Sequence, residues 1–85
     1  MKFIAEIDIM PRSELLDPQG RAIRKNIHKV DIIGVEDVRI GKHIRMTLDA
    51  ESEAEASTKV DEACKKLLAN AIVETYTFEI KSIEN

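Results

Sequence analysis

Hydrophobic and polar residues alternate over residues 2–10, which predicts a strand with one buried face. The hydrophobic face comprises Phe3, Ala5, Ile7 and Ile9, and Glu6 and Asp8 lie on the opposite face. Pro11 is expected to end this strand, because proline has no amide to donate to a neighbouring strand. Residues 72–83 predict another strand, since they are rich in β-branched and aromatic residues.

A first helix is predicted from Pro18 to about Val30. Asp17 can accept hydrogen bonds from the unpaired amides at its start, and Pro18 suits the first helical position. Hydrophobic residues recur at helical spacing and form one face, made of Ala22, Ile23, Ile27 and Val30.

A second helix is predicted after Ser52, which forms a capping box with Glu55, and it is expected to end near Asn70. Its hydrophobic stripe comprises Ala56, Val60, Ala63, Cys64 and Leu67. We expect Ile27 of the first helix and Leu67 of the second to be buried against the sheet.

The longest regular pattern covers residues 36–50. Its even-numbered positions are hydrophobic at Val38, Ile40, Ile44, Met46, Leu48 and Ala50, and most odd-numbered positions are polar. A two-residue hairpin turn at Gly41 and Lys42 would divide the hydrophobic residues between two faces, so one continuous strand with a bend or bulge at Gly41 is favoured. A hairpin with a three-residue loop is the alternative, because it also keeps the hydrophobic residues on one face.

A continuous strand of this length would extend past the core of its own chain. About fourteen residues at ~3.3 Å each span roughly 46 Å, whereas a globule of this chain length has a diameter of about 31 Å. We therefore expect a second copy of the chain to pair with the strand, giving a dimer or a tetramer.

The 85 residues suffice for one domain, so residues 1–85 are predicted to form a single unit. The expected order is strand, helix, long strand, helix, strand. Because each helix has one hydrophobic face, both are expected to cover the same side of a single antiparallel sheet. This arrangement is an α+β two-layer sandwich close to the ferredoxin-like layout.

Charge and composition narrow the range of partners. Thirteen Lys and Arg against sixteen Asp and Glu give a net charge of −3, which argues against nucleic acid binding. A single cysteine cannot form an internal disulfide. No hydrophobic run approaches the ~20 residues of a membrane span. We expect a cytoplasmic protein that binds neither nucleic acid nor a membrane.

The sequence predicts no catalytic, cofactor-binding or metal-binding residues. His28 and His43 lack ligand-spaced neighbours and are expected to be exposed. Cys64 lies on a hydrophobic helix stripe and is expected to be a buried thiol. The three glycines are too scattered for a phosphate-binding loop.

Two polar segments are candidates for partner contacts. The first is the opening of the first helix, made of Asp17, Pro18, Gln19 and Gly20. A helical glycine costs about 1 kcal/mol relative to alanine, so a partner or an anion is expected to approach the backbone at Gly20; a harmless glycine in a frayed turn is the alternative. The second is the stripe of Arg39, Gly41, Lys42, His43 and Arg45, which can bind an acidic partner or form an ordinary solvated face.

Three motifs in the same regions carry a resemblance to a known family. They are residues 16–20 (LDPQG), 37–42 (DVRIGK) and 64–70 (CKKLLAN). In order, spacing and total length they are similar to the PurS family, the small subunit of phosphoribosylformylglycinamidine synthase. Ala71 departs from the family pattern, which usually has proline there.

The resemblance implies a PurS-like fold and a chain that is inactive alone. In that enzyme a glutaminase subunit, PurQ, releases ammonia, and a synthetase subunit, PurL, uses ATP and Mg to convert formylglycinamide ribonucleotide (FGAR) into formylglycinamidine ribonucleotide (FGAM) in de novo purine synthesis. A PurS dimer bridges the two and holds no cofactor. The alternative is a ferredoxin-like regulatory module that binds a small molecule; an RNA-binding sheet would need exposed aromatic residues on central strands.

Overall fold

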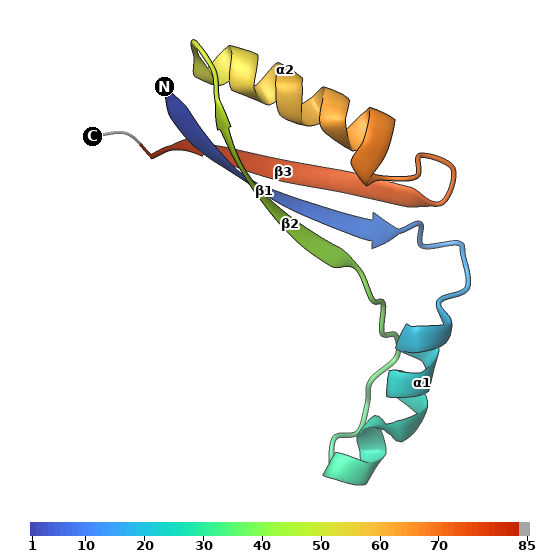
Figure 1. The fold of residues 1–85 in the computed structure, drawn as a ribbon. Coiled ribbons are helices and arrows are strands. Elements are labelled where there is room, and N and C mark those ends of the chain that lie inside the picture. Colours follow the sequence, from blue (N-terminus) through green and yellow to red (C-terminus); the bar gives the residue numbers. More distant parts are fainter. Residues whose placement is uncertain (84–85) are drawn as a thin grey trace.

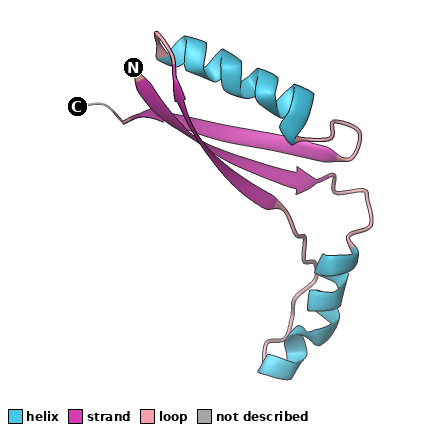
Figure 2. Ribbon diagram, viewed as in Figure 1, coloured by secondary structure: helices cyan, strands magenta, loops and turns pink. Residues whose placement is uncertain are grey.

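The computed structural model describes residues 1–83, and its elements follow the predicted order (Figures 1 and 2). The strands are β1 (Lys2–Pro11), β2 (Lys42–Asp49) and β3 (Glu74–Ser82). The helices are α1 (Pro18–Asn26), continued by the 3₁₀ turn η1 (Ile27–Val30), and α2 (Glu53–Ala63), continued by the π turn η2 (Cys64–Leu68). The strands form one antiparallel sheet in the order β2-β1-β3, which confirms the α+β class.

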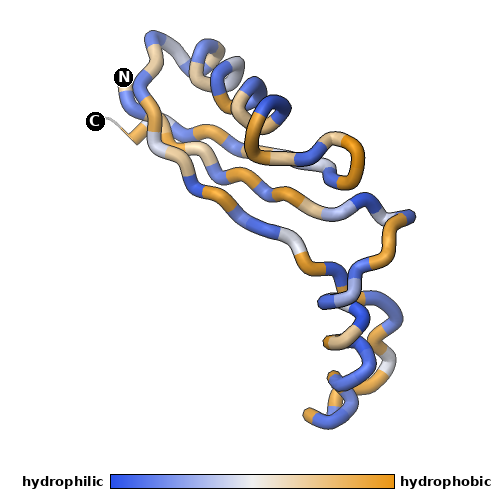
Figure 3. The backbone as a smooth tube through the Cα atoms, turned by 45° about the vertical axis from the view of Figure 1, so that its right-hand side comes forward, coloured by the Kyte–Doolittle hydropathy of each residue, from blue (hydrophilic) through white to orange (hydrophobic). Residues whose placement is uncertain are grey.

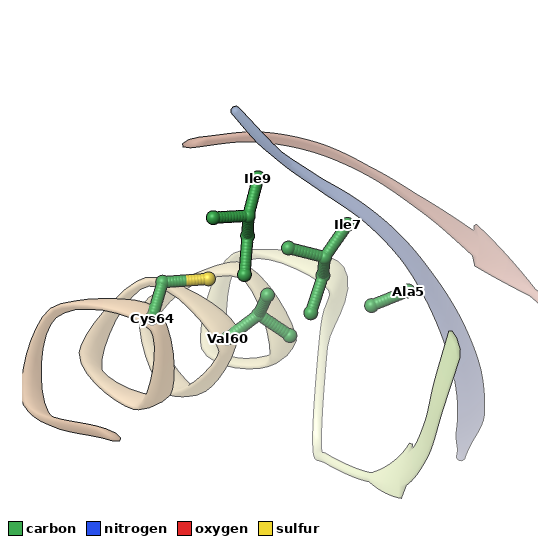
Figure 4. Close-up of a cluster of buried hydrophobic side chains, with 5 residues drawn as sticks. All are labelled: Ala5, Ile7, Ile9, Val60 and Cys64. Atoms are coloured by element: carbon green, nitrogen blue, oxygen red, sulfur yellow. The ribbon is translucent and has the colours of Figure 1, made fainter. Parts of the chain in front are cut away.

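One face of the sheet is covered by α2. The sheet, α2 and η2 form what we call the body, which comprises residues 1–11 and 42–83. The predicted hydrophobic face of β1 is fully buried, with Phe3 at 1% exposure and Ala5, Ile7 and Ile9 at 0%. Figure 4 shows Val60 and Cys64 from the second helix pointing towards this face. Burying an aliphatic side chain contributes about 1.5–3 kcal/mol, so this cluster is the main source of stability in the body.

The prediction that Leu67 belongs to this core is wrong, because its exposed fraction is 82%. The helix widens at η2, where the amide of Ala69 donates to the carbonyl of Cys64, five residues earlier, at 3.0 Å. A π turn holds more residues than an α turn, so the residue that returns to the core side lies four positions after Cys64 and not three. Leu68 packs against the core instead.

The first helix does not cover the sheet, so the prediction that both helices share one face is wrong for α1. Residues 12–41, which we call the arm, leave the body beyond the end of β1 and return to β2 (Figure 1). The sheet has three strands and one hydrophobic face, and α2 already covers that face. No room is left there for a second helix. Ile27 is therefore half-buried away from the sheet, and Ile23 and Val30 are 42% and 65% exposed.

Residues 36–50 run on without reversing direction, but only Lys42–Asp49 of this segment form a strand. β2 pairs with β1 from Lys42 opposite Ile9 to Asp49 opposite Lys2, so no hairpin forms at Gly41. A Cβ on Gly41 would lie 2.4 Å from the carbonyl oxygen of Ile9, which shows how tightly the backbone passes β1 there. The predicted continuous strand is thus too long, because residues 36–41 leave the sheet and run beside α1 (Figure 1).

The arm makes the chain elongated. The radius of gyration of the chain is 16.7 Å and the longest extent of the chain is 50 Å. A compact chain of this length has a radius of gyration of about 12 Å. Extra surface is therefore exposed along the arm and at its junction with the body.

Candidate partner-binding site

The base of the arm is held by the carboxylate of Asp17. One oxygen accepts the Gly20 amide at 3.0 Å, as predicted for a helix cap, and the other accepts the Ile40 amide at 2.6 Å. The backbone amides of Gly20 and Ile40 stabilise the charged carboxylate and so lower the pKa of Asp17 below its usual value. Asp17 thereby joins the start of α1 to the segment that returns towards β2.

Gly20 is buried, and the backbone that approaches it belongs to the same chain. A Cβ on Gly20 would lie 1.9 Å from the carbonyl oxygen of Val38 and 2.7 Å from its carbonyl carbon. The prediction that a partner's backbone approaches this glycine is therefore corrected. Glycine is needed here because α1 packs directly against residues 37–40.

Arg39 also holds the base of the arm together through hydrogen bonds. Its guanidinium donates to the carbonyl of Ser13 at 2.9 Å and to the carbonyl of Leu15, and its Nε lies 3.3 Å from a carboxylate oxygen of Asp37. Around these contacts lies a pocket of about 400 Å³ lined by the loop after β1, by α1 and by residues 37–39. The structure thus brings Arg39 together with the helix opening, although 22 residues separate Arg39 from Asp17 in sequence.

The remaining charged residues of the predicted stripe lie away from the arm, around the start of β2. Arg45 donates to Glu6 at 2.6 Å, and His43 lies between the carboxylates of Glu6 and Asp8, 2.7 Å from the latter. Asp8 and then Glu6 raise the pKa of His43 by stabilising its protonated form. Lys42 lies 3.7 Å from a carboxylate oxygen of Glu74, so these cations face acids of their own chain.

The predicted stripe is therefore two separate groups, and its cations are already neutralised. Pro18 and Gln19 are exposed beside the buried Gly20, and Gly41 marks the bend between the groups. A role for these residues in partner binding stays a prediction.

Exposed hydrophobic residues gather at the far end of the arm, and two of them, Ile32 and Ile33, belong to no predicted element. Val30, Ile32 and Ile33 are 65%, 47% and 87% exposed, and Gly34 turns the chain there with a φ of +87°. Leu67 and Ile72, near the end of the second helix, are each 82% exposed. The adjacent isoleucines before Gly34 were the available signal, because they belong to no predicted core face.

The chemistry of the remaining candidates is limited. Cys64 is fully buried, and burial raises the pKa of its thiol, which opposes formation of the reactive thiolate. Within residues 1–83, no three His, Cys, Asp or Glu side chains gather closely enough to hold a metal ion. Over the same residues, no helix has the length and hydrophobicity needed to cross a membrane.

Sequence comparisons point to one family. Residues 4–82 match the family model described as PurS, phosphoribosylformylglycinamidine (FGAM) synthase. The PurS subunit of that synthase from Synechocystis sp. is 45% identical over 73 residues, which cover 86% of this chain and 73% of the relative. The Bacillus subtilis subunit is 38% identical over 72 residues, covering 85% of this chain and 84% of that subunit.

Solved structures have the same fold. PurS from Methanocaldococcus jannaschii, one of the subunits of formylglycinamide ribonucleotide amidotransferase in the purine biosynthetic pathway, has a TM-score of 0.82 at 30% identity, with 96% of this chain and 99% of that chain covered. A chain in the PurLQS structure from Thermotoga maritima has a TM-score of 0.87 at 32% identity, with 95% and 99% covered. The likeness includes the arm, because coverage of this order leaves out only a few residues.

Proposed function

The chain belongs to the PurS family of phosphoribosylformylglycinamidine synthase, and from this membership we propose that it joins the other subunits of that synthase without performing a chemical step. As a PurS subunit it is part of a ligase of purine biosynthesis. The observation that carries the proposal is the family match over residues 4–82, which includes both the body and the arm.

In this proposal the reaction belongs to two partners. A PurQ-type glutaminase releases ammonia from glutamine, and a PurL-type synthetase uses ATP and Mg to convert FGAR into FGAM. The buried thiol of Cys64 and the mutually neutralised charges of His43, Arg45 and Glu6 support a non-catalytic role. We assign ATP and Mg to the synthetase and no cofactor to this chain, and we place the complex in the cytoplasm, in keeping with a single unpaired cysteine.

A second copy of the chain is part of the same proposal. The accessible surface is 6317 Å², whereas a compact protein of this mass exposes about 5,100 Å². The excess of about 1,200 Å² is larger than the roughly 800 Å² that one partner contributes to a standard protein interface. Both β2 and β3 are edge strands, and the hydrophobic residues of the arm lie outside the body's own core, so a second copy can cover either.

The test is reconstitution with the PurL and PurQ subunits of the same organism. We expect the chain alone to form no FGAM and its addition to restore glutamine-dependent synthesis, with a ternary complex visible by sedimentation. Synthesis with ammonia in place of glutamine is the control, because it bypasses the docking of the glutaminase. Full glutamine-dependent activity without this chain would overturn the proposed function.

A further inference from the structure

The arm contains a run of cations without acids. α1 and η1 hold Arg21, Arg24, Lys25 and Lys29, and no Asp or Glu occurs between Asp17 and Asp31. The rest of the chain has nine Lys and Arg against sixteen Asp and Glu. An acidic protein therefore presents one basic helix, and that helix lies on the part that projects from the body (Figures 1 and 3).

The side chains of these four cations have no partner among residues 1–83. All four are exposed, and within residues 1–83 their side chains form no hydrogen bond or ion pair. Seven other cations each contact a carboxylate or carbonyl of the same chain: Arg12, Arg39, Lys42, Arg45, Lys59, Lys65 and Lys66. Charges that the fold leaves unneutralised are available to attract another molecule.

Three of the cations lie on the side of the helix opposite Ile23, Ile27 and Val30. With about 100° per residue in an α-helix and about 120° in a 3₁₀ turn, Arg21, Lys25 and Lys29 lie between about 120° and 240° around the axis from Ile27. Gly20 lies near Ile27 on the side that packs against Val38. A second copy that covered the hydrophobic side would leave Arg21, Lys25 and Lys29, which we call the basic face, pointing outwards.

We propose that the basic face of α1 docks against a carboxylate-rich surface on another subunit of the synthase. The inference rests on the proposed function, because it names the surface through which this chain reaches a partner. A protein surface fits better than a nucleic acid, since the net charge of the chain is −3 and residues 12–41 contain no Phe, Tyr or Trp on which a base can stack. The basic face differs from the stripe around Gly41, whose cations are paired within the chain.

The decisive experiment compares two triple charge reversals. The test variant is R21E/K25E/K29E, and the matched control is K59E/K65E/K66E on the second helix, where each lysine is paired with an acid four residues earlier in the same helix. Both variants change the net charge equally. Their affinity for purified PurL and PurQ is measured separately and together by sedimentation, with the self-association and the melting curve of each variant recorded alongside.

We expect the test variant to keep its self-association and to bind the partner complex about tenfold more weakly or worse, while the control binds as the wild type does. Wild-type binding should also weaken as salt rises, and the test variant should lose most of that dependence. If the reversal impairs folding, R21Q/K25Q/K29Q replaces it, because glutamine keeps the length and the helix propensity.

Several results would overturn the inference while leaving the proposed function intact. These are wild-type assembly by the test variant, equal weakening by both triple variants, wild-type assembly that is insensitive to salt, and loss of self-association together with assembly. Binding of a labelled single-stranded RNA through the same three residues, without an effect on assembly, would assign the face to another partner. Failure of the wild-type chain to join PurL and PurQ would instead overturn the proposed function.

Discussion

The body and the arm contain similar hydrophobic residues, but those of the body are buried and many of those in the arm are exposed to solvent. In the body, Ile7 and Val60 are fully buried, whereas Ile23 and Ile33 in the arm are 42% and 87% exposed. Arg45 and Lys65 of the body lie beside acids of the same chain, while the cations of α1 have no such partner in the part of the chain that the structure describes. The core of the body is thus closed by its own hydrophobic residues, whereas α1 and η1 leave hydrophobic and basic side chains exposed.

The two regions also differ in what holds them in place. The body is stabilised by hydrophobic burial, which is cooperative and independent of a few polar atoms. The arm is fixed at its base by the Asp17 carboxylate and by the close fit of Gly20 against Val38. The buried clusters of the body thus draw on its own residues alone, whereas the geometry of the arm depends on a small junction at its base.

The largest expected effect comes from removing a core side chain of the body. Ile7→Ala should lower the free energy of unfolding by about 2–5 kcal/mol, because Ile7 is fully buried under the second helix. The same truncation in the arm, Ile23→Ala, should change it by less than about 1 kcal/mol. Urea denaturation of both variants measures the difference. Equal losses would show that the arm is as tightly packed as the body.

A smaller effect is expected at the junction. Gly20→Ala places a methyl group against the carbonyl of Val38, and overpacking of this kind costs about 1–3 kcal/mol. Because the strain lies in the arm, hydrogen exchange should accelerate for the amides of α1 and remain slow in β1. Gln19→Ala is the control at the exposed neighbouring position, and it should leave exchange unchanged. Unaltered exchange in Gly20→Ala would mean that α1 does not pack on residues 37–40.

The smallest expected effect is a pH dependence confined to the junction. Backbone hydrogen bonds lower the pKa of Asp17 below its ordinary value of 3.8 in the folded state. The carboxylate therefore stabilises the arm fully above that value, and this contribution is lost as pH falls through the lowered pKa. The amide NMR signals of Gly20 and Ile40 should shift together with a midpoint below 3.8.

Asp17→Asn supplies the control for this titration, since the amide keeps an oxygen acceptor but does not ionise at these pH values. The coupled shift of the two amides should be absent in that variant. A midpoint at or above the ordinary value, or a shift that survives in Asp17→Asn, would contradict the described junction.

Much of the body could be predicted from local patterns. The buried face of β1 follows from alternation, and the start of each helix follows from a capping residue, Asp17 or Ser52, whose side-chain bond the structure confirms. Leu67 could not be placed in the same way, since the π turn that rotates it into solvent leaves no mark in the hydrophobic spacing. The sequence names the candidate residues one by one, but it does not show that they divide into a junction around Asp17 and a paired polar face around Arg45.

The periodic elements, their caps, the α+β class and the family motifs can be read from the chain alone, because they depend on the spacing and backbone preferences of neighbouring residues. Three features emerge only in the folded molecule: α1 leaves the sheet, the Gly20 backbone meets Val38, and Arg45 and His43 face Glu6. An amphipathic helix specifies which side it buries but not against which surface. That choice depends on the room left by α2 on the sheet and on contacts between residues far apart in the chain.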